Sequence, residues 1–315
     1  MRYFEPAPGF TLSCVALGGH EYLDDGRSRG FNESFADAIR PGHIFPGFGG
    51  PARRAVLARA YDLGINFFDV TLDSEKEALG RNLAEMPPPH DVFVQTRPEG
   101  MVYGYDPGNA KLLDLGLLRT EVQRCLGLLR RERIDILNCA IMAAALKGRA
   151  DYLDILAGNV AELQREGLIG LAAADTFSGL AVYRAMVATG AFATLNVNFN
   201  LADDGPGDGL LGLPAGIVAR EAFIKGEIFR LGQAAGIPDA GLLARAAMKW
   251  VMAHDGVDAV IAGAATPAHL TANVAAALMP AMNEDEMAAL AAIAVLPEFD
   301  ALRTARRRAF LETAR

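Results

Sequence analysis

The sequence has few of the residues that cross-link small domains or bind metals. Cysteine, histidine and lysine are scarce, with three, five and five copies in 315 residues. The cysteines Cys14, Cys125 and Cys139 are odd in number and widely spaced, which excludes a disulfide framework and the usual zinc patterns. The histidines lack close ligand spacing, so no metal site is predicted. Buried thiols in a reducing compartment are expected instead, which predicts a cytoplasmic protein.

Long apolar segments and an excess of positive charge are missing as well. No segment of about 18 apolar residues is free of charge, so a transmembrane helix is not expected. The first residues, MRYFEPAPGF, lack the basic-then-apolar pattern of a signal peptide. The net charge of −8 disfavours nucleic acids and anionic membranes as partners. A small-molecule substrate is the expected partner, and the sequence indicates no oligomeric state.

Short apolar runs alternate with amphipathic stretches along the chain. A hydrophobic content of 51% is enough for a large buried core. In Leu118, Val122, Leu126 and Leu129 the apolar residues recur at helical spacing. Eight strands alternating with helices predict a single (β/α)8 TIM barrel over residues 1–315. The predicted strands are Cys14–Gly18, Asn66–Val70, Val92–Thr96, Ile134–Cys139, Gly170–Ala174, Leu195–Phe199, Ile217–Ala219 and Ala259–Ile261.

Two connections depart from this pattern. The stretch 20–50 after the first strand is long, and loops in that position lie on the face where barrel enzymes do their chemistry, so we predict an active-site lid. The segment Asp203–Gly216, DDGPGDGLLGLPAG, has too much Gly and Pro for a full crossover helix. It contains the spacing Gly207-x-Gly209-x-x-Gly212. The next strand follows too soon for a dinucleotide-binding helix, so we interpret this motif as a flexible loop.

Several segments, taken together, resemble the aldo-keto reductase family. They keep the family's order and cover nearly the whole chain. The resemblance implies a TIM barrel, in agreement with the strand count. The segments are LGINFFD (63–69), SEKEALG (74–80), VFVQTR (92–97), RRERIDIL (130–137), EGLIGLAAADTF (166–177), LNVNFN (195–200), VAREAFIKG (218–226) and IAGAATPAHLTAN (261–273).

The resemblance also implies an activity, the reduction of carbonyl compounds with NADPH by an Asp, a Tyr, a Lys and a His. Asp69 matches the Asp. The segment Val70–Asp73, where the Tyr would follow, is shorter than the family's and has no tyrosine. Arg97 stands in the Lys position and Ala140 in the His position. The family's Lys tunes the pKa of the proton-donating Tyr, and Arg does not replace Lys in that role because it stays protonated.

A relocated tyrosine is one way to restore the missing proton donor. Tyr103 and Tyr105 lie in the loop after the third predicted strand, in MVYGYDP. Each of the two is a candidate proton donor or, alternatively, an aromatic residue packed at the rim of the barrel.

The family's cofactor-binding residues are retained in part. The Ser-Asn pair that holds the nicotinamide amide corresponds to Asp175 and Thr176. Ala265 replaces the Arg that binds the 2′-phosphate of NADPH, and a strong charge-assisted contact is lost with it. A preference for NADPH is therefore doubtful, and NAD(P) binding is left open. The cofactor-binding residues that the resemblance retains are Lys225, Gly226 and Asn273.

Polar residues gather near the ends of the predicted strands. Asn196, Asn198 and Asn200 alternate along one strand and share a face. Buried amides need hydrogen-bond partners, so the three predict a polar site at the mouth or a network inside the barrel. Ser74 and Glu77, at the start of a helix, are interpreted as a capping box without chemistry. The substrate-binding candidates are Asn138, Asp175, Asn196, Asn198, Arg220, Tyr103 and Tyr105.

The residue types at the predicted mouth suit proton transfer on a small anionic molecule. Arg97 and Arg220 are candidates to hold a carboxylate or a phosphate. The catalytic candidates are Asp69, Arg97, His20 and Glu21, and Glu99 is a further acid that could transfer protons. Two structural alternatives stay open: Arg97 pairs with Asp69, or His20 binds a loop carbonyl.

Three functions agree with these residues. The first is an aldo-keto-reductase-like barrel enzyme with non-redox proton-transfer chemistry, an isomerase, epimerase or lyase that acts on a small polar, anionic metabolite. The second is an NAD(P)H-dependent carbonyl oxidoreductase with a relocated proton donor. The third is a non-catalytic sensor of a nucleotide or metabolite. The first is preferred because only Asp69 of the hydride-transfer set remains, beside a mouth rich in acids, bases and arginines.

Overall fold

The computed structural model describes residues 1–23 and 25–312. Eight parallel strands close a barrel in which β10 pairs with both β9 and β3. The predicted parallel barrel is confirmed, and each predicted strand agrees with the observed one to within one residue at either end. The barrel strands are β3 (Val15–Gly18), β4 (Phe67–Val70), β5 (Phe93–Thr96), β6 (Ile134–Ala140), β7 (Ile169–Asp175), β8 (Thr194–Asn198), β9 (Gly216–Arg220) and β10 (Ala259–Ala262).

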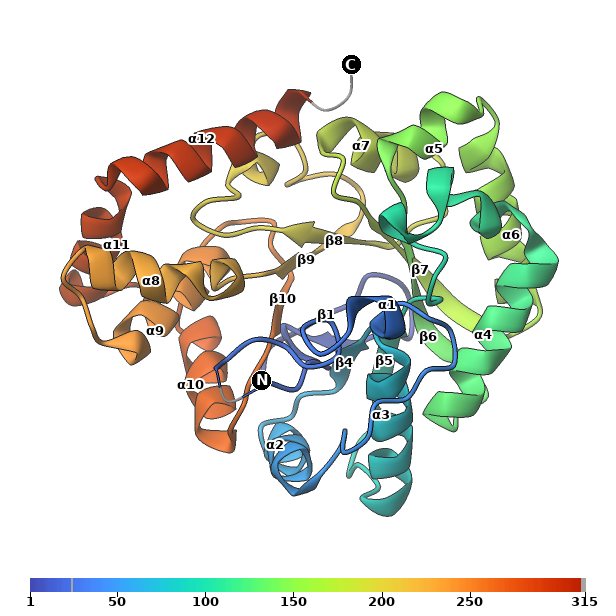
Figure 1. The fold of residues 1–315 in the computed structure, drawn as a ribbon, viewed down its shortest axis with the longest axis horizontal. Helices are drawn as coiled ribbons and strands as arrows, with labels where there is room; N and C mark the ends of the chain where they lie inside the picture. Colours follow the sequence, from blue (N-terminus) through green and yellow to red (C-terminus); the bar gives the residue numbers. More distant parts are fainter. Residues whose placement is uncertain (24, 313–315) are drawn as a thin grey trace.

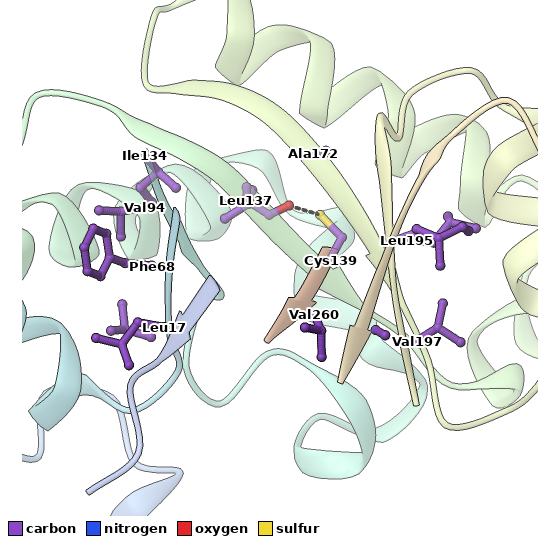
Figure 2. Close-up of a cluster of buried hydrophobic side chains, with 14 of the residues drawn as sticks. Leu17, Phe68, Val94, Ile134, Leu137, Cys139, Ala172, Leu195, Val197 and Val260 are labelled. Atoms are coloured by element: carbon purple, nitrogen blue, oxygen red, sulfur yellow. Dashed lines mark hydrogen bonds between the residues drawn. The ribbon is translucent and has the colours of Figure 1, made fainter. Parts of the chain in front are cut away.

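Helices surround the strands on the outside of the barrel (Figure 1). Their apolar faces pack against the outward-facing strand residues, and Figure 2 shows part of this core, including Val94 and Leu195. The helices between barrel strands are α1 (Phe35–Ala38), α2 (Pro51–Asp62), α3 (Asp73–Glu85), α4 (Leu115–Leu129), α5 (Ala143–Gly148), α6 (Tyr152–Arg165), α7 (Leu180–Ala188), α8 (Glu227–Ala234) and α9 (Ala240–Met252). After β10 come α10 (Pro267–Leu278), α11 (Glu284–Ala294) and α12 (Pro297–Glu312).

An N-terminal hairpin packs against the apolar end of the barrel interior. Strands β1 (Tyr3–Phe4) and β2 (Leu12–Ser13) pair antiparallel. Phe4 and Phe10 join a cluster with inward-facing residues such as Phe67 and Ile136. This apolar cluster fills the amino-terminal end of the barrel, so the opposite end is the one left for polar chemistry.

The barrel interior changes from apolar to polar along individual strands. In β4 the inward-facing Phe67 is followed two residues later by Asp69, and in β5 Phe93 is followed by Gln95. Asp69 and Gln95 are register partners, so both point into the barrel. The polar residues therefore occupy the carboxyl ends of the strands, where barrel active sites lie.

One barrel helix is missing, and the C-terminal helix packs in its place. Between β8 and β9 the chain forms only the 3₁₀ turn η3 (Gly205–Asp208), as the composition of Asp203–Gly216 predicts. Helix α12 packs against η3 and α7. Arginines of α12 form ion pairs with aspartates of the η3 segment. The pairs join Arg303 and Arg307 to Asp204, Arg306 to Asp203, and Arg307 to Asp208.

The long stretch 20–50 is anchored to the start of α3 and contributes the short helix α1. Gly42 N–H donates to Asp73 and Phe45 N–H to the Ser74 hydroxyl. Figure 1 draws α1 in front of the barrel strands, and its Phe35 ring contacts Tyr105 at 5.8 Å between centroids. Its role as a lid stays a prediction. Among the described residues, no helix is both long enough and apolar enough to cross a membrane.

Candidate functional site

The carboxyl ends of β7 and β9 meet in a buried ion pair. Arg220 donates two hydrogen bonds to Asp175, with Nη2–Oδ1 at 2.6 Å and Nη1–Oδ2 at 2.8 Å. Tyr103, in the turn η1 (Tyr103–Tyr105), donates its hydroxyl to Asp175 Oδ2 at 2.5 Å and accepts from Arg220 Nη1 at 2.7 Å. Asn138 Nδ2 also donates to Oδ2, at 3.1 Å. Four of the predicted mouth residues thus form one cluster in which Asp175 is fully engaged.

Tyr103 is held in this cluster in its protonated form. Burial raises the pKa of Tyr103, and the charge of Asp175 adds to this, while Arg220 opposes it only in part. The ring is stacked on Phe177 with centroids 4.5 Å apart. A buried hydroxyl with a raised pKa, already donated to a carboxylate, is a poor proton donor to a substrate.

His20 forms a second cluster, with a glutamate that the sequence analysis did not single out. Its Nδ1 lies 2.7 Å from Glu75 Oε1. The other oxygen of Glu75 accepts hydrogen bonds from the N–H groups of Thr71 and Leu72. Because Glu75 binds Nδ1, the Nε2 atom is the one left for a substrate. The His20 side chain is 39% exposed, whereas that of Glu75 is 1% exposed.

The charges of this His–Glu pair stabilise each other. Burial alone would lower the pKa of His20, but the charge and hydrogen bond of Glu75 raise it above the usual 6.5. Burial would raise the pKa of Glu75, but His20 and the two backbone N–H groups lower it to about 2. The pair thus shifts the protonation of His20 toward the imidazolium. The alternative that His20 binds a loop carbonyl is not what the structure shows.

Asp69 lies on the inner face of β4, where the charges of Arg97 and His20 both act on it. Its Oδ1 accepts from Gln95 Nε2 at 2.8 Å, and Gln95 also donates to Asn196 Oδ1 at 3.3 Å. Burial raises the pKa of Asp69, although Gln95 and Arg97 lower it in part. The predicted network inside the barrel is present at Asn196. The alternative in which Arg97 pairs with Asp69 is not realised, since the partner of Asp69 is Gln95.

Arg97 directly follows β5 and lies against two tyrosine rings. Its guanidinium carbon lies 5.0 Å from the centroid of Tyr103 and 5.8 Å from that of Tyr105. The residue is 5% exposed. In the chain as described, its Nε has no hydrogen-bond partner.

Two of the predicted acids have structural contacts instead. Glu21 accepts from the N–H of Gly49 at 2.6 Å, which ties the two ends of the 20–50 stretch together. Glu99 is fully buried, with one oxygen 3.9 Å from the ammonium of Lys76. Proton transfer by either acid stays a prediction without geometric support.

Two local predictions on polar residues are wrong. Asn200 lies past the end of β8 and binds Asp203 and the carbonyl of Glu221, so it closes a turn rather than extending the polar face. Ser74 is not the N-cap of α3, because that helix begins at Asp73 and its first turn is satisfied by Glu75. The alternation of asparagines holds only as far as the strand continues.

A cavity of about 220 Å³ lies beside the mouth, beneath α12. Its walls include Asn198, Lys225 and Phe177, with Phe310 contributed by α12. Asn198 is thus placed next to open space, as expected for a substrate-binding residue, and its function stays a prediction.

Two of the residues expected to bind a nicotinamide dinucleotide, Lys225 and Asn273, have contacts within the protein. Asn273 donates its amide to the carbonyl of Gly263 at 3.3 Å, and the Tyr22 hydroxyl packs so closely on Gly263 that no side chain would fit there. Lys225 pairs with Glu221 at 3.3 Å. Gly226 has φ of 92°, a turn that favours glycine.

The residue expected at the nicotinamide end of the cofactor is also bound within the protein. Asp175, in the place of the family's amide-binding residues, has its oxygens bound by Arg220, Tyr103 and Asn138. Ala265 offers no charge to a 2′-phosphate. With the correspondence that the resemblance implies, Asp175 and Ala265 do not fit the family's usual contacts with NADPH. Separately, the described residues contain no group of three or more His, Cys, Asp or Glu placed to hold a metal.

Comparisons with known proteins agree with this architecture. The glycerol dehydrogenase AKR11B4 of Gluconobacter oxydans superposes with a TM-score of 0.63 at 18% identity, covering 92% of this chain and 94% of that one. The holo form of the aldo-keto reductase AKR11C1 of Bacillus halodurans gives 0.65 at 16% identity, with 100% of each chain covered. At this identity the likeness shows the fold alone. A comparison with curated proteins found no match.

Family membership rests on a separate sequence comparison. The model of the aldo/keto reductase family matches residues 51–211, just over half of the chain. The matched region holds β4 to β8, with Asp69, Arg97 and Asp175. The chain belongs to the aldo/keto reductase family.

Proposed function

We propose that this barrel is an enzyme that transfers protons on a small polar metabolite, as an isomerase, epimerase or lyase. One observation carries the proposal: the His20–Glu75 pair presents an imidazole at the mouth, and the charge of Asp69 acts on it. Together they form a set of titratable groups suited to acid–base chemistry.

The two groups have separate roles in the proposed reaction. Asp69 acts as the base, since burial raises its pKa from the usual range of an aspartate toward that of a useful proton acceptor. His20 acts as the acid through Nε2–H, because Glu75 raises its pKa and favours the protonated ring. Gln95 holds the Asp69 carboxylate in place through one oxygen and leaves the other for substrate.

The engagement of Tyr103 supports the choice of non-redox chemistry. A relocated tyrosine donor would need a hydroxyl free to reach a carbonyl, and the Tyr103 hydroxyl is bound between Asp175 and Arg220. Tyr105 is more accessible, but burial raises its pKa as well.

Exchange of carbon-bound hydrogen in D₂O tests this proposal directly. We would incubate the protein with small hydroxy acids, sugar acids, keto acids and amino acids, and follow loss of C–H signals by NMR. The expected result is exchange for at least one class. Asp69→Asn and His20→Ala should each abolish this exchange without unfolding the protein. Asp151→Asn, at an exposed surface ion pair, should leave it unchanged.

An NAD(P)H-dependent carbonyl oxidoreductase is the second candidate, because the family and the similar glycerol dehydrogenase favour it. Titration with NADPH, NADP⁺, NADH and NAD⁺ distinguishes the two. Micromolar binding followed by carbonyl-dependent oxidation of NADPH, with no hydrogen exchange in D₂O, would overturn the proton-transfer proposal. Nucleotide binding without any turnover would point to a sensor instead.

A further inference from the structure

We infer that Arg97 is the receptor for an oxyanion group of the substrate, a carboxylate in the first instance. This inference names the substrate class and rests on the function proposed above. It makes Arg97 a specificity-determining residue rather than a structural cation.

The first observation is that Arg97 is a buried cation without a partner of opposite charge. Over residues 1–23 and 25–312 it forms no ion pair within 4 Å, and its Nε has no hydrogen-bond partner. Glu99 is the acid whose charge acts most strongly on it, but one Glu99 oxygen is 3.9 Å from Lys76. Lys76 in turn binds Asp73 at 2.9 Å. The negative charge that acts most strongly on Arg97 is thus shared with another buried cation.

The second observation is the contrast with Arg220, the other arginine at the same mouth. Arg220 is neutralised by a bidentate pair with Asp175. Removing a guanidinium from water is costly unless hydrogen bonds and an opposite charge replace the lost hydration. The Nε atoms of both arginines lack a hydrogen-bond partner, so the difference lies in the opposite charge: Arg220 has it in Asp175, and Arg97 obtains it in direct contact only when an anion is bound.

The third observation is that the guanidinium is already oriented. The rings of Tyr103 and Tyr105 flank it at 5.0 and 5.8 Å, and Tyr105 also has a side-chain hydrogen bond with Arg97, contacts that hold a planar cation in place. Phe35 of the 20–50 stretch packs on Tyr105, and the half-exposed His20 lies at the edge of this stretch beside Phe31. An anion bound by Arg97 would therefore lie between the acid–base groups and the predicted lid.

The geometry favours a carboxylate over a phosphate group. A single planar guanidinium matches the two oxygens of a carboxylate through parallel hydrogen bonds. A dianionic phosphate usually needs further donors, such as backbone N–H groups at the start of a helix. Both are oxyanions, and the test below separates them.

Isothermal titration of the whole chain at constant ionic strength tests the inference. The probes are malonate and inorganic phosphate, each titrated into the unaltered protein, Arg97→Met, Arg97→Lys and Arg54→Met. Arg54 forms a surface ion pair with Glu85 and serves as the matched control. We expect malonate binding to weaken at least tenfold in Arg97→Met, partly in Arg97→Lys, and not in Arg54→Met.

The outcomes are separable from those of the proposed function. Binding of phosphate but not malonate, lost in Arg97→Met, would keep the oxyanion receptor and assign it to phosphate. Equal binding in all four proteins, or none in any, would overturn it; circular dichroism and Arg97→Lys guard against a folding defect. Hydrogen exchange with neutral substrates alone would support the proposed function and refute the role of Arg97. Anion binding without exchange would do the reverse.

Discussion

Replacing Glu75 by glutamine removes one negative charge from the mouth and keeps the size of the side chain. Glutamine can still accept from the N–H groups of Thr71 and Leu72, but it cannot stabilise an imidazolium at His20. Burial, which is the largest effect on His20, then acts against the charged ring with only the charge of Asp69 opposing it. The pKa of His20, above 6.5 in the unaltered protein, should fall below 6.5 in Glu75→Gln.

The pKa of Glu75 sets the upper limit of the magnitude. A shift from 4.5 to about 2 corresponds to ~3 kcal/mol at 1.36 kcal/mol per unit, and the share due to the N–H groups of Thr71 and Leu72 is kept by glutamine. The raised pKa of His20 reports the same coupling and is not added to it. The contribution of Glu75 is present above pH 4.5 and is lost as pH falls toward 2. That of protonated His20 is present below pH 6.5 and is lost as pH rises through its raised pKa. The loss of stability in Glu75→Gln should therefore be largest between pH 4.5 and 6.5.

Two measurements check this prediction. NMR titration of the five histidines, with His20→Asn to assign the signal, gives the pKa in each protein. Denaturant unfolding at several pH values gives the free energy of unfolding. Glu77→Gln is the control, because Glu77 lies on the same helix and pairs with Arg81 at the surface, where such pairs contribute about 0–1 kcal/mol. An unchanged His20 pKa, or a stability loss that does not depend on pH, would refute the reasoning.

Three further changes probe the fold. Asp175→Asn leaves the buried Arg220 without its bidentate partner, so unfolding free energy should fall by about 3–5 kcal/mol in denaturant titrations; a loss below 1 kcal/mol would contradict this. Gly80→Ala should lower the melting temperature, because the added Cβ would lie 2.7 Å from Leu129 Cα. The better helix propensity of alanine acts in the opposite direction, so a higher melting temperature would refute the close approach. Phe310→Ala should speed limited proteolysis of α12, and an unchanged rate would show that the ion pairs alone hold the helix.

The barrel could be predicted from the sequence because every strand is a short apolar run buried on both faces. Such runs are bounded by polar or Gly residues, and the alternation with helical spacing leaves few other folds. The absence of a crossover helix in Asp203–Gly216 could be predicted as well, because the Gly and Pro content of this segment prevents a helix. The packing of α12 in place of that helix could not be predicted, because its contacts with this segment join residues about a hundred positions apart.

The site was only partly predictable for the same reason. The carboxyl ends of the strands in a parallel barrel meet at one end, so the sequence predicts that Asn138, Asp175 and Arg220 lie together, as they do. Nothing in the spacing distinguishes Glu75 from an ordinary acid in the first turn of a helix, and its contact with His20 joins positions 55 residues apart. Periodicity also misled at Asn200, since a two-residue repeat carries no sign of where the strand stops.

Arginine in the family's Lys position changes what the neighbouring groups can do. A lysine beside a tyrosine can lower the tyrosine pKa and share its proton, whereas Arg97 keeps its charge at any ordinary pH. The tyrosines above it, Tyr103 and Tyr105, have pKa values that burial raises rather than values tuned toward neutrality. The pKa values of His20, after β3, and of Asp69, on the neighbouring β4, are also raised, and these two groups start from lower values than a tyrosine. A fixed cation beside a titratable acid and base is the arrangement that suits the proposed proton transfer on an anion.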